Sequence, residues 1–216
     1  VQRPVAIFSF GVVVFVATSI AEEWWRGIAA RRRAGDNWAL GWWRLVNGNR
    51  PRHGGYIVHI SILMLGLGII GTNFYQQRTD GALALGESLV IDNYRIEYVD
   101  NNDSSRPDRI AQWAEMSVYE IDPGDYKHEI SFAKAQGSSG FTLKDSTPRP
   151  NDELIDTIEP WHGFYTDFNM ASVRSGIIST VIEDLYVIPR DFLADGRISL
   201  AVSINPLAWW LWASGP

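Results

Sequence analysis

The sequence contains no cysteine among its 216 residues. This absence excludes disulfide frameworks, cysteine-ligated zinc, iron–sulfur clusters and thiol nucleophiles. It leaves the redox compartment open, because a chain without thiols is indifferent to it. The sequence also lacks a recognisable Ser/His/Asp set and any nucleic-acid-binding motif, and its acidic pairs Asp152–Glu153 and Glu183–Asp184 are typical of solvated surfaces. We therefore expect neither a hydrolase nor a nucleic-acid partner.

Charged residues are missing from two long segments. Residues 4–21 form an uncharged run of 18 positions, which spans about 27 Å as a helix. A signal peptide is the alternative, but the run has no small-residue cleavage site and an arginine-rich segment follows it. Residues 54–75 form a second uncharged run, with aromatic residues near both of its ends. We expect membrane-spanning helices over residues 1–22 and 54–75.

Positive charge is concentrated near the N-terminus. Residues 1–54 carry a net charge of +5, whereas residues 55–216 carry −11. Seven arginines lie between the two runs: Arg26, Arg31, Arg32, Arg33, Arg44, Arg50 and Arg52. Short arginine-rich loops remain in the cytoplasm, so we expect residues 23–53 to be a basic, tryptophan-rich cytoplasmic loop. Its residues Trp38, Gly41, Trp42 and Leu45 have the spacing of a short helix in the headgroup layer.

The remaining chain is acidic and rich in turn signals. Period-two alternation at 94–98, 129–132 and 198–204 predicts strands, and the clusters at 122–125, 136–140 and 146–151 predict turns. We expect a β-rich extracytoplasmic domain over residues 76–204, whose last strand buries Ile198, Leu200, Val202 and Ile204. Residues 205–216 are apolar and predict the start of a further transmembrane helix. The chain begins at Val1 without methionine, and we expect it to be a piece of a longer polypeptide.

Two features of the second run have competing interpretations. Gly66, Gly68 and Gly71 match a G-x-G-x-x-G dinucleotide motif, but that motif requires a strand-to-helix turn. Within a membrane helix they predict a smooth face for close approach of another helix or a flat cofactor. His59 is the ionisable residue within the run, and it fits a helix–helix hydrogen bond, haem or metal ligation, or proton transfer. His53, His128 and His162 lie in polar segments and are expected at a solvated surface.

Several motifs together indicate a known family. They are Trp25-Arg26-Gly27, the run NRPRHGGYIVH from Asn49 to His59, TVIEDLYV at 180–187, and Asn205-Pro206-Leu207 followed by Trp210 and Trp212. In order and spacing they resemble the C-terminal portion of the CcmF family of cytochrome c-type biogenesis proteins, the haem lyase subunit family. Pro51 and His53 replace the arginine and tyrosine usual in that family. The family's tryptophan-rich haem-delivery segment is absent.

The resemblance implies a multi-pass protein of the inner (cytoplasmic) membrane that handles haem in cytochrome c maturation. It implies that His59 is an axial ligand to the iron of a b-type haem, haem b, whose second axial ligand lies outside this fragment and which relays electrons from quinol. The implied partners are other cytochrome c maturation subunits, a haem chaperone, apocytochrome c and the lipid bilayer. No catalytic residue is assigned, and whether the fragment itself acts as an enzyme stays open.

The expected fold is thus a membrane α-helical protein with a β-rich extracytoplasmic domain, two full spans and the start of a third. A chain without thiols cannot reduce the cysteines of an apocytochrome, so separate thiol-redox partners are expected to dock on the acidic domain. The alternative is a membrane-tethered extracytoplasmic binding or scaffold module without haem, with His59 as a structural hydrogen-bond donor. A related haem exporter or a nitrite-reductase-specific homologue also remains open.

Overall fold

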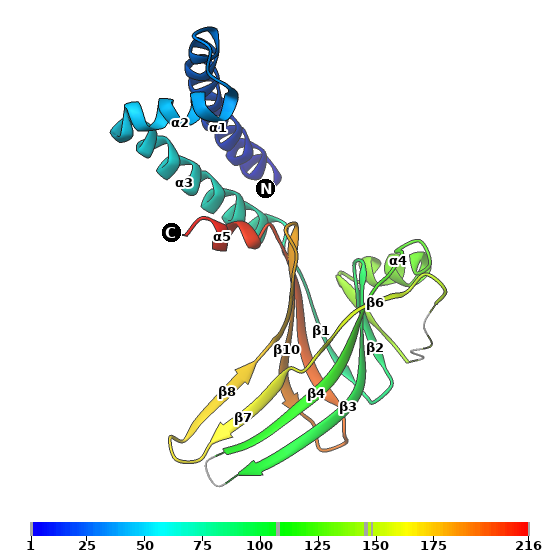
Figure 1. The fold of residues 1–216 in the computed structure, drawn as a ribbon. Helices are drawn as coiled ribbons and strands as arrows, with labels where there is room; N and C mark the ends of the chain where they lie inside the picture. Colours follow the sequence, from blue (N-terminus) through cyan, green and yellow to red (C-terminus); the bar gives the residue numbers. More distant parts are fainter. Residues whose placement is uncertain (1, 107–108, 145–146, 148, 216) are drawn as a thin grey trace. The chain divides into compact units, whose positions relative to one another are not determined.

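The computed structural model describes the chain except for residues 1, 107–108, 145–146, 148 and 216 (Figure 1). It divides into a helical unit and a β unit. The helical unit comprises Val1–Gln76, Thr180–Glu183 and Pro206–Pro216, and the β unit comprises Gln77–Ser179 and Asp184–Asn205. Each unit is described by itself.

The helical unit contains four helices: α1 (Gln2–Arg33), α2 (Trp38–Gly48), α3 (Arg50–Phe74) and α5 (Trp209–Ala213). Asparagine side chains begin two of them. Asn37 accepts from the backbone N–H of Leu40 at 2.8 Å to begin α2, and Asn49 accepts from Arg52 to begin α3. Helix α2 coincides with the predicted amphipathic stretch, so the prediction of a short helix there is confirmed.

Helices α1 and α3 extend beyond the uncharged runs that predicted them. α1 continues to Arg33 through an ion pair between Glu22 and Arg26, one helical turn apart, and it includes Gly27 without a break. Gly35 has a φ of +101°, the left-handed conformation that commonly ends a helix. α3 begins at Arg50, so His53 lies in its first turn. Most of the segment 23–53 is therefore helical.

Both long helices expose their apolar side chains. In the most apolar 18-residue windows of α1 and α3, 11% and 17% of the residues are buried. Phe8 and Phe15 of α1 and Ile62 of α3 are among the exposed large side chains. Helices of this length and composition can cross a membrane, and such exposure is what a surrounding apolar medium would stabilise.

The β unit is built from two antiparallel sheets (Figure 1). One sheet has the order β1-β11-β10-β9, and the other has the order β5-β2-β3-β4-β7-β8 with β6 also paired to β4. The strands are β1 (Gln77–Leu83), β2 (Ser88–Ile91), β3 (Tyr94–Arg106), β4 (Arg109–Glu120), β5 (Gly140–Leu143), β6 (Glu153–Ile158), β7 (Trp161–Tyr165), β8 (Met170–Arg174), β9 (Gly176–Ser179), β10 (Glu183–Phe192) and β11 (Ile198–Pro206).

Strand β11 supplies one side of the core of the β unit. Ile198, Leu200, Val202 and Ile204 are fully buried, which confirms the predicted final strand and its buried face. They pack with apolar residues of both sheets: Leu83, Leu89, Ile91, Tyr94, Ile96, Tyr98, Ala114, Met116, Val118, Ile158, Leu185 and Val187. Pairing of β11 with β1 ends at Ile204, as expected where Pro206 offers no N–H to a ladder.

The predicted strand at 129–132 is wrong, because residues Lys127–Ala135 form helix α4. In a strand, Ile130 and Phe132 would share one face. In the helix, Ile130 and Ala133 pack inward while Phe132 is exposed. The turns predicted at 122–125 and 136–140 are present, whereas the one at 146–151 falls partly outside the described residues.

Candidate functional site

His59 lies on α3 with its side chain exposed. Its Nδ1 is 2.7 Å from the carbonyl oxygen of Gly55, one turn earlier in the same helix. A carbonyl oxygen only accepts hydrogen bonds, so the ring donates from Nδ1 and the lone pair of the neutral ring is on Nε2. With Nδ1 held against its own helix, Nε2 is the nitrogen available to a partner outside the helix. Metal-binding histidines commonly show this arrangement.

Small residues near His59 leave open space on the surface of α3. A Cβ atom built on Gly54 or Gly55 would meet nothing within 4 Å, so this stretch of α3 has open space beside it. Ile62 and Gly66 follow His59 by three and seven residues and therefore lie on the same side of the helix. Ile62 is exposed. This strip leaves Nε2 accessible to a ligand from outside the helix.

An adjoining side of α3 packs against α1, where a Cβ on Gly66 would lie 3.9 Å from Val13. A cavity of about 260 Å³ lies between these helices, lined from α3 by Ile60, Leu63, Met64 and Leu67. Val13, Ala17, Ile20, Ala21 and Trp24 line it from α1. His59 does not line this cavity, and its ring nitrogen Nδ1 bonds within its own helix, to the carbonyl of Gly55.

His53 is buried at 4% exposure, so its expected place at a solvated surface is wrong. Its Nδ1 accepts a hydrogen bond of 3.2 Å from Trp24 Nε1 of α1, and its ring packs edge-on against Tyr56. The expectation failed because α3 begins three residues before His53 and turns this side chain toward α1. Six residues separate His53 from His59, which places them about 120° apart around the helix. His53 therefore cannot serve the same ligand. His128 is exposed and His162 half-buried.

The glycines of α3 confirm the predicted smooth helix face. A Cβ on Gly68 would collide with Leu211 of α5, and one on Gly71 would overlap the carbonyl oxygen of Pro206. The G-x-G-x-x-G run lies within α3 and not at a strand-to-helix turn, so its glycines serve helix packing. The segment expected to start a third span is what packs there.

Within the described residues, no group of three or more His, Asp or Glu side chains is arranged to hold a metal ion. The solvated-surface interpretation is nevertheless wrong for two of the acidic residues. Asp152 Oδ2 lies 3.0 Å from Nε of the buried Arg95, and Asp184 is 1% exposed. Burial raises the pKa of the Asp184 carboxyl, and the neighbouring Ser179 partly offsets this.

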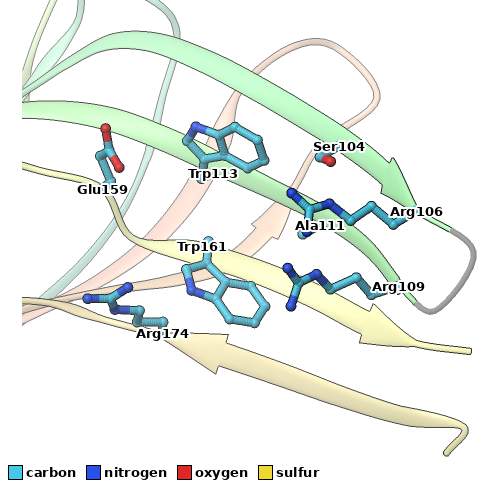
Figure 2. A pocket seen from close by; sticks show the side chains of 8 residues that line it. All are labelled: Ser104, Arg106, Arg109, Ala111, Trp113, Glu159, Trp161 and Arg174. Carbon is cyan, nitrogen blue, oxygen red and sulfur yellow. The ribbon is translucent and has the colours of Figure 1, made fainter.

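A groove on the longer sheet was not foreseen from the sequence (Figure 2). Its volume is about 360 Å³. The residues that line it are Ser104, Arg106, Arg109, Ala111, Trp113, Glu159, Trp161 and Arg174. One signal could have indicated it. Eight of the ten tryptophans lie in the arginine-rich segment or among the last eight residues, and the other two are Trp113 and Trp161.

Comparison with known proteins gives one relevant likeness. No protein-family model matches the chain, and no curated protein does. A solved structure titled "Cytochrome c Heme Lyase CcmF" superposes with a TM-score of 0.63 at 19% sequence identity. The superposition covers 97% of this chain and 28% of that one, so the chain spans little more than a quarter of that protein. This coverage fits the C-terminal portion that the motifs indicated. The resemblance drawn from the motifs is thereby confirmed in the fold: nearly the whole chain has the fold of a part of the cytochrome c haem lyase CcmF.

Proposed function

We propose that this chain is part of a CcmF-type cytochrome c haem lyase and acts in cytochrome c maturation. The observation that carries the proposal is the agreement between motifs and fold. The motifs that resemble the family extend from Trp25 to Trp212, and the fold matches over 97% of the chain. Attachment of haem to apocytochrome c would belong to the complete protein and its partners, because this chain spans 28% of the solved relative.

The proposal places α1 and α3 across the cytoplasmic membrane, with α5 as the start of a third span. The arginines that flank these helices keep residues 23–53 in the cytoplasm and leave the β domain outside it. Support comes from the exposed apolar side chains of α1 and α3. Topology reporters fused at Gly35 and Gly137 should give opposite signals, and equal signals would contradict this sidedness.

His59 is proposed as an axial ligand to a b-type haem. When bound, the haem would supply an iron that carries one electron at a time from quinol. The hydrogen bond from Nδ1 to the Gly55 carbonyl fixes the ring orientation and keeps the lone pair on Nε2, where the iron would bind. Ile62 and Gly55, close to His59 on the same side of α3, leave room for a flat apolar group beside this nitrogen. A second axial ligand would come from outside this chain.

The partners follow from the same proposal. The chain carries no thiol, so reduction of apocytochrome cysteines requires other proteins. Other cytochrome c maturation subunits, a haem chaperone and apocytochrome c are the proposed partners, and the β domain offers the largest surface for them outside the membrane.

The test is an absorption spectrum of the complete protein that contains this chain. His59→Gly should remove or strongly weaken the reduced α band of the b-type haem, and added imidazole should partly restore it. His128→Ala, on the exposed face of α4, is the matched control and should leave the band unchanged. If His59→Gly inserts normally and keeps the wild-type spectrum, His59 is a packing residue. The chain would then be a membrane-tethered binding module without a haem ligand.

A further inference from the structure

The groove of Figure 2 is formed by one face of four consecutive strands, β3, β4, β7 and β8. Alternate residues of a strand point to the same face, so Arg109, Ala111 and Trp113 of β4 lie together. The registers add to this face Ser104 and Arg106 of β3, Trp161 and Gly163 of β7, and Arg174 of β8. Residues that are distant in sequence thus meet because of strand pairing.

Small residues hollow out the middle of this face. Ala111 and Gly163 are register partners, and neither fills the space between the larger side chains around them. A Cβ on Gly163 would collide with the ring of Trp161, so this glycine lets the indole lie close over its own strand. Figure 2 shows Trp113 and Trp161 in the middle of the groove, with Arg106 and Arg109 toward one end and Arg174 toward the other.

The three arginines of the groove differ from the other arginines of this acidic domain in their ion pairing. The segment 55–216 holds 11 basic and 22 acidic residues, so most of its basic side chains could find a carboxylate. Four arginines of the domain do so: Arg95, Arg149, Arg190 and Arg197. The described residues omit Pro107 and Asp108. Among them, no Asp or Glu carboxylate lies within ion-pair distance of Arg106, Arg109 or Arg174. Glu159 also lines the groove and pairs with none of them.

The groove adjoins an open sheet edge. Strand β8 is the last strand of its sheet and pairs only with β7 in the part of the chain that the structure describes. It contains neither lysine nor proline, the residues that commonly protect such an edge. An extended segment from another protein can add to an open edge through backbone hydrogen bonds while its alternate side chains reach the adjacent face.

We propose that this groove, formed by Arg106, Arg109, Trp113, Trp161 and Arg174, binds an extended acidic segment of a partner protein. Carboxylates of the segment would pair with the arginines, and its apolar or aromatic side chains would rest on the two indoles. This inference goes beyond the proposed function and does not require haem at His59.

The spacing of the arginines favours an extended peptide over a small anion. Arg109 and Arg174 are separated by two strand-to-strand steps and by four residues along the strands, about 10 Å by about 13 Å. A single carboxylate cannot lie close to both Arg109 and Arg174. An extended chain can present carboxylates and an aromatic ring at alternate residues of one face, about 7 Å apart, and can engage both ends of the groove.

The test measures fluorescence anisotropy of a labelled peptide, Glu-Ser-Glu-Ser-Phe-Ser-Glu, with the full 216-residue chain in nanodiscs of neutral phosphatidylcholine. When this peptide is extended, its alternate residues present three carboxylates and one aromatic ring to the same face. The peptide should bind, and its affinity should fall as salt is raised. The triple variant Arg106→Gln, Arg109→Gln and Arg174→Gln should weaken binding at least about tenfold, because charged hydrogen bonds are lost. Trp161→Ala should also weaken it.

The matched control removes the same charge elsewhere in the β domain. Arg78→Gln, Arg190→Gln and Arg197→Gln together should leave the affinity within about twofold, since none of the three lines the groove. Arg190 and Arg197 form exposed ion pairs, so their loss should also cost little stability. Thermal unfolding checks that both triple variants are folded. An equal loss in both variants, or binding of a peptide with lysine in place of glutamate, would overturn the proposal. Glutarate competing as well as the peptide would overturn it too, because it would indicate a small-anion site.

Discussion

The two units of the molecule place their apolar side chains differently. In the β unit, the main core cluster brings together residues of both sheets, and none of its buried members is more than 7% exposed. In the helical unit, Phe8 and Phe15 of α1 are 73% and 72% exposed, and α3 exposes Ile62. The β unit therefore carries its own hydrophobic stabilisation, whereas the long helices depend on a medium or on neighbours outside the chain.

The largest expected effect sharpens this contrast. Leu200→Ala should lower the free energy of unfolding of the β unit by about 2–5 kcal/mol, because it leaves a cavity in a fully buried site. Phe15→Ala removes a larger but exposed side chain and should change that free energy by less than about 0.5 kcal/mol. Denaturant unfolding of the chain in detergent, followed by the far-ultraviolet circular dichroism of the sheets, measures both. Equal effects of the two variants would contradict the division of roles between the units.

A smaller effect is expected within the helical unit, where glycines permit close packing. Gly71→Ala places a methyl group against the carbonyl of Pro206 and should destabilise the packing of α5 on α3 by about 1–3 kcal/mol. Gly54→Ala, on the same helix, meets nothing within 4 Å and is the control. Tryptophan fluorescence from α5 during thermal unfolding reports the difference. If Gly71→Ala behaves like Gly54→Ala, α5 does not depend on this contact.

The local hydrophobic pattern was enough to predict elements that have one apolar and one polar face. The strand at 198–204 and helix α2 follow from periodicity alone. Arg95 shows where this reasoning ends. It alternates with the buried Tyr94 and Ile96 in β3 and would be expected in water, yet it is 1% exposed. Asp152 pairs with it from a distant segment, and Tyr119 packs against its guanidinium, so both faces of the sheet are covered at this position. Burial by residues that are distant in sequence cannot be predicted from the local hydrophobic pattern.

The candidate sites differ in the same way. His59 could be singled out from the sequence, because an ionisable residue in an uncharged run is costly unless it has a role. Its hydrogen bond to Gly55 is also local, one helical turn away. The tryptophan distribution singles out Trp113 and Trp161 but not the groove, since Arg106, Trp113, Trp161 and Arg174 meet only through the registers of three strand pairs. The burial of His53 likewise depends on Trp24 of another helix.

The smallest expected effect concerns Asp184 of β10, whose buried carboxyl is an exception within the well-packed β unit. Burial raises the pKa of Asp184 in the folded chain above the value of about 3.9 that an unfolded aspartate has. The folded state therefore binds this proton more tightly, and stability falls as the pH rises from the unfolded pKa through the folded one. Asp184→Asn keeps the shape of the side chain and cannot ionise. The variant should be more stable than the wild type at pH 7, and the difference should vanish near pH 3. Unfolding free energies at pH 3, 5 and 7 measure this, with Asp103→Asn on the exposed part of β3 as the control. A pH dependence unchanged by Asp184→Asn would show that the buried carboxylate is fully stabilised by its surroundings.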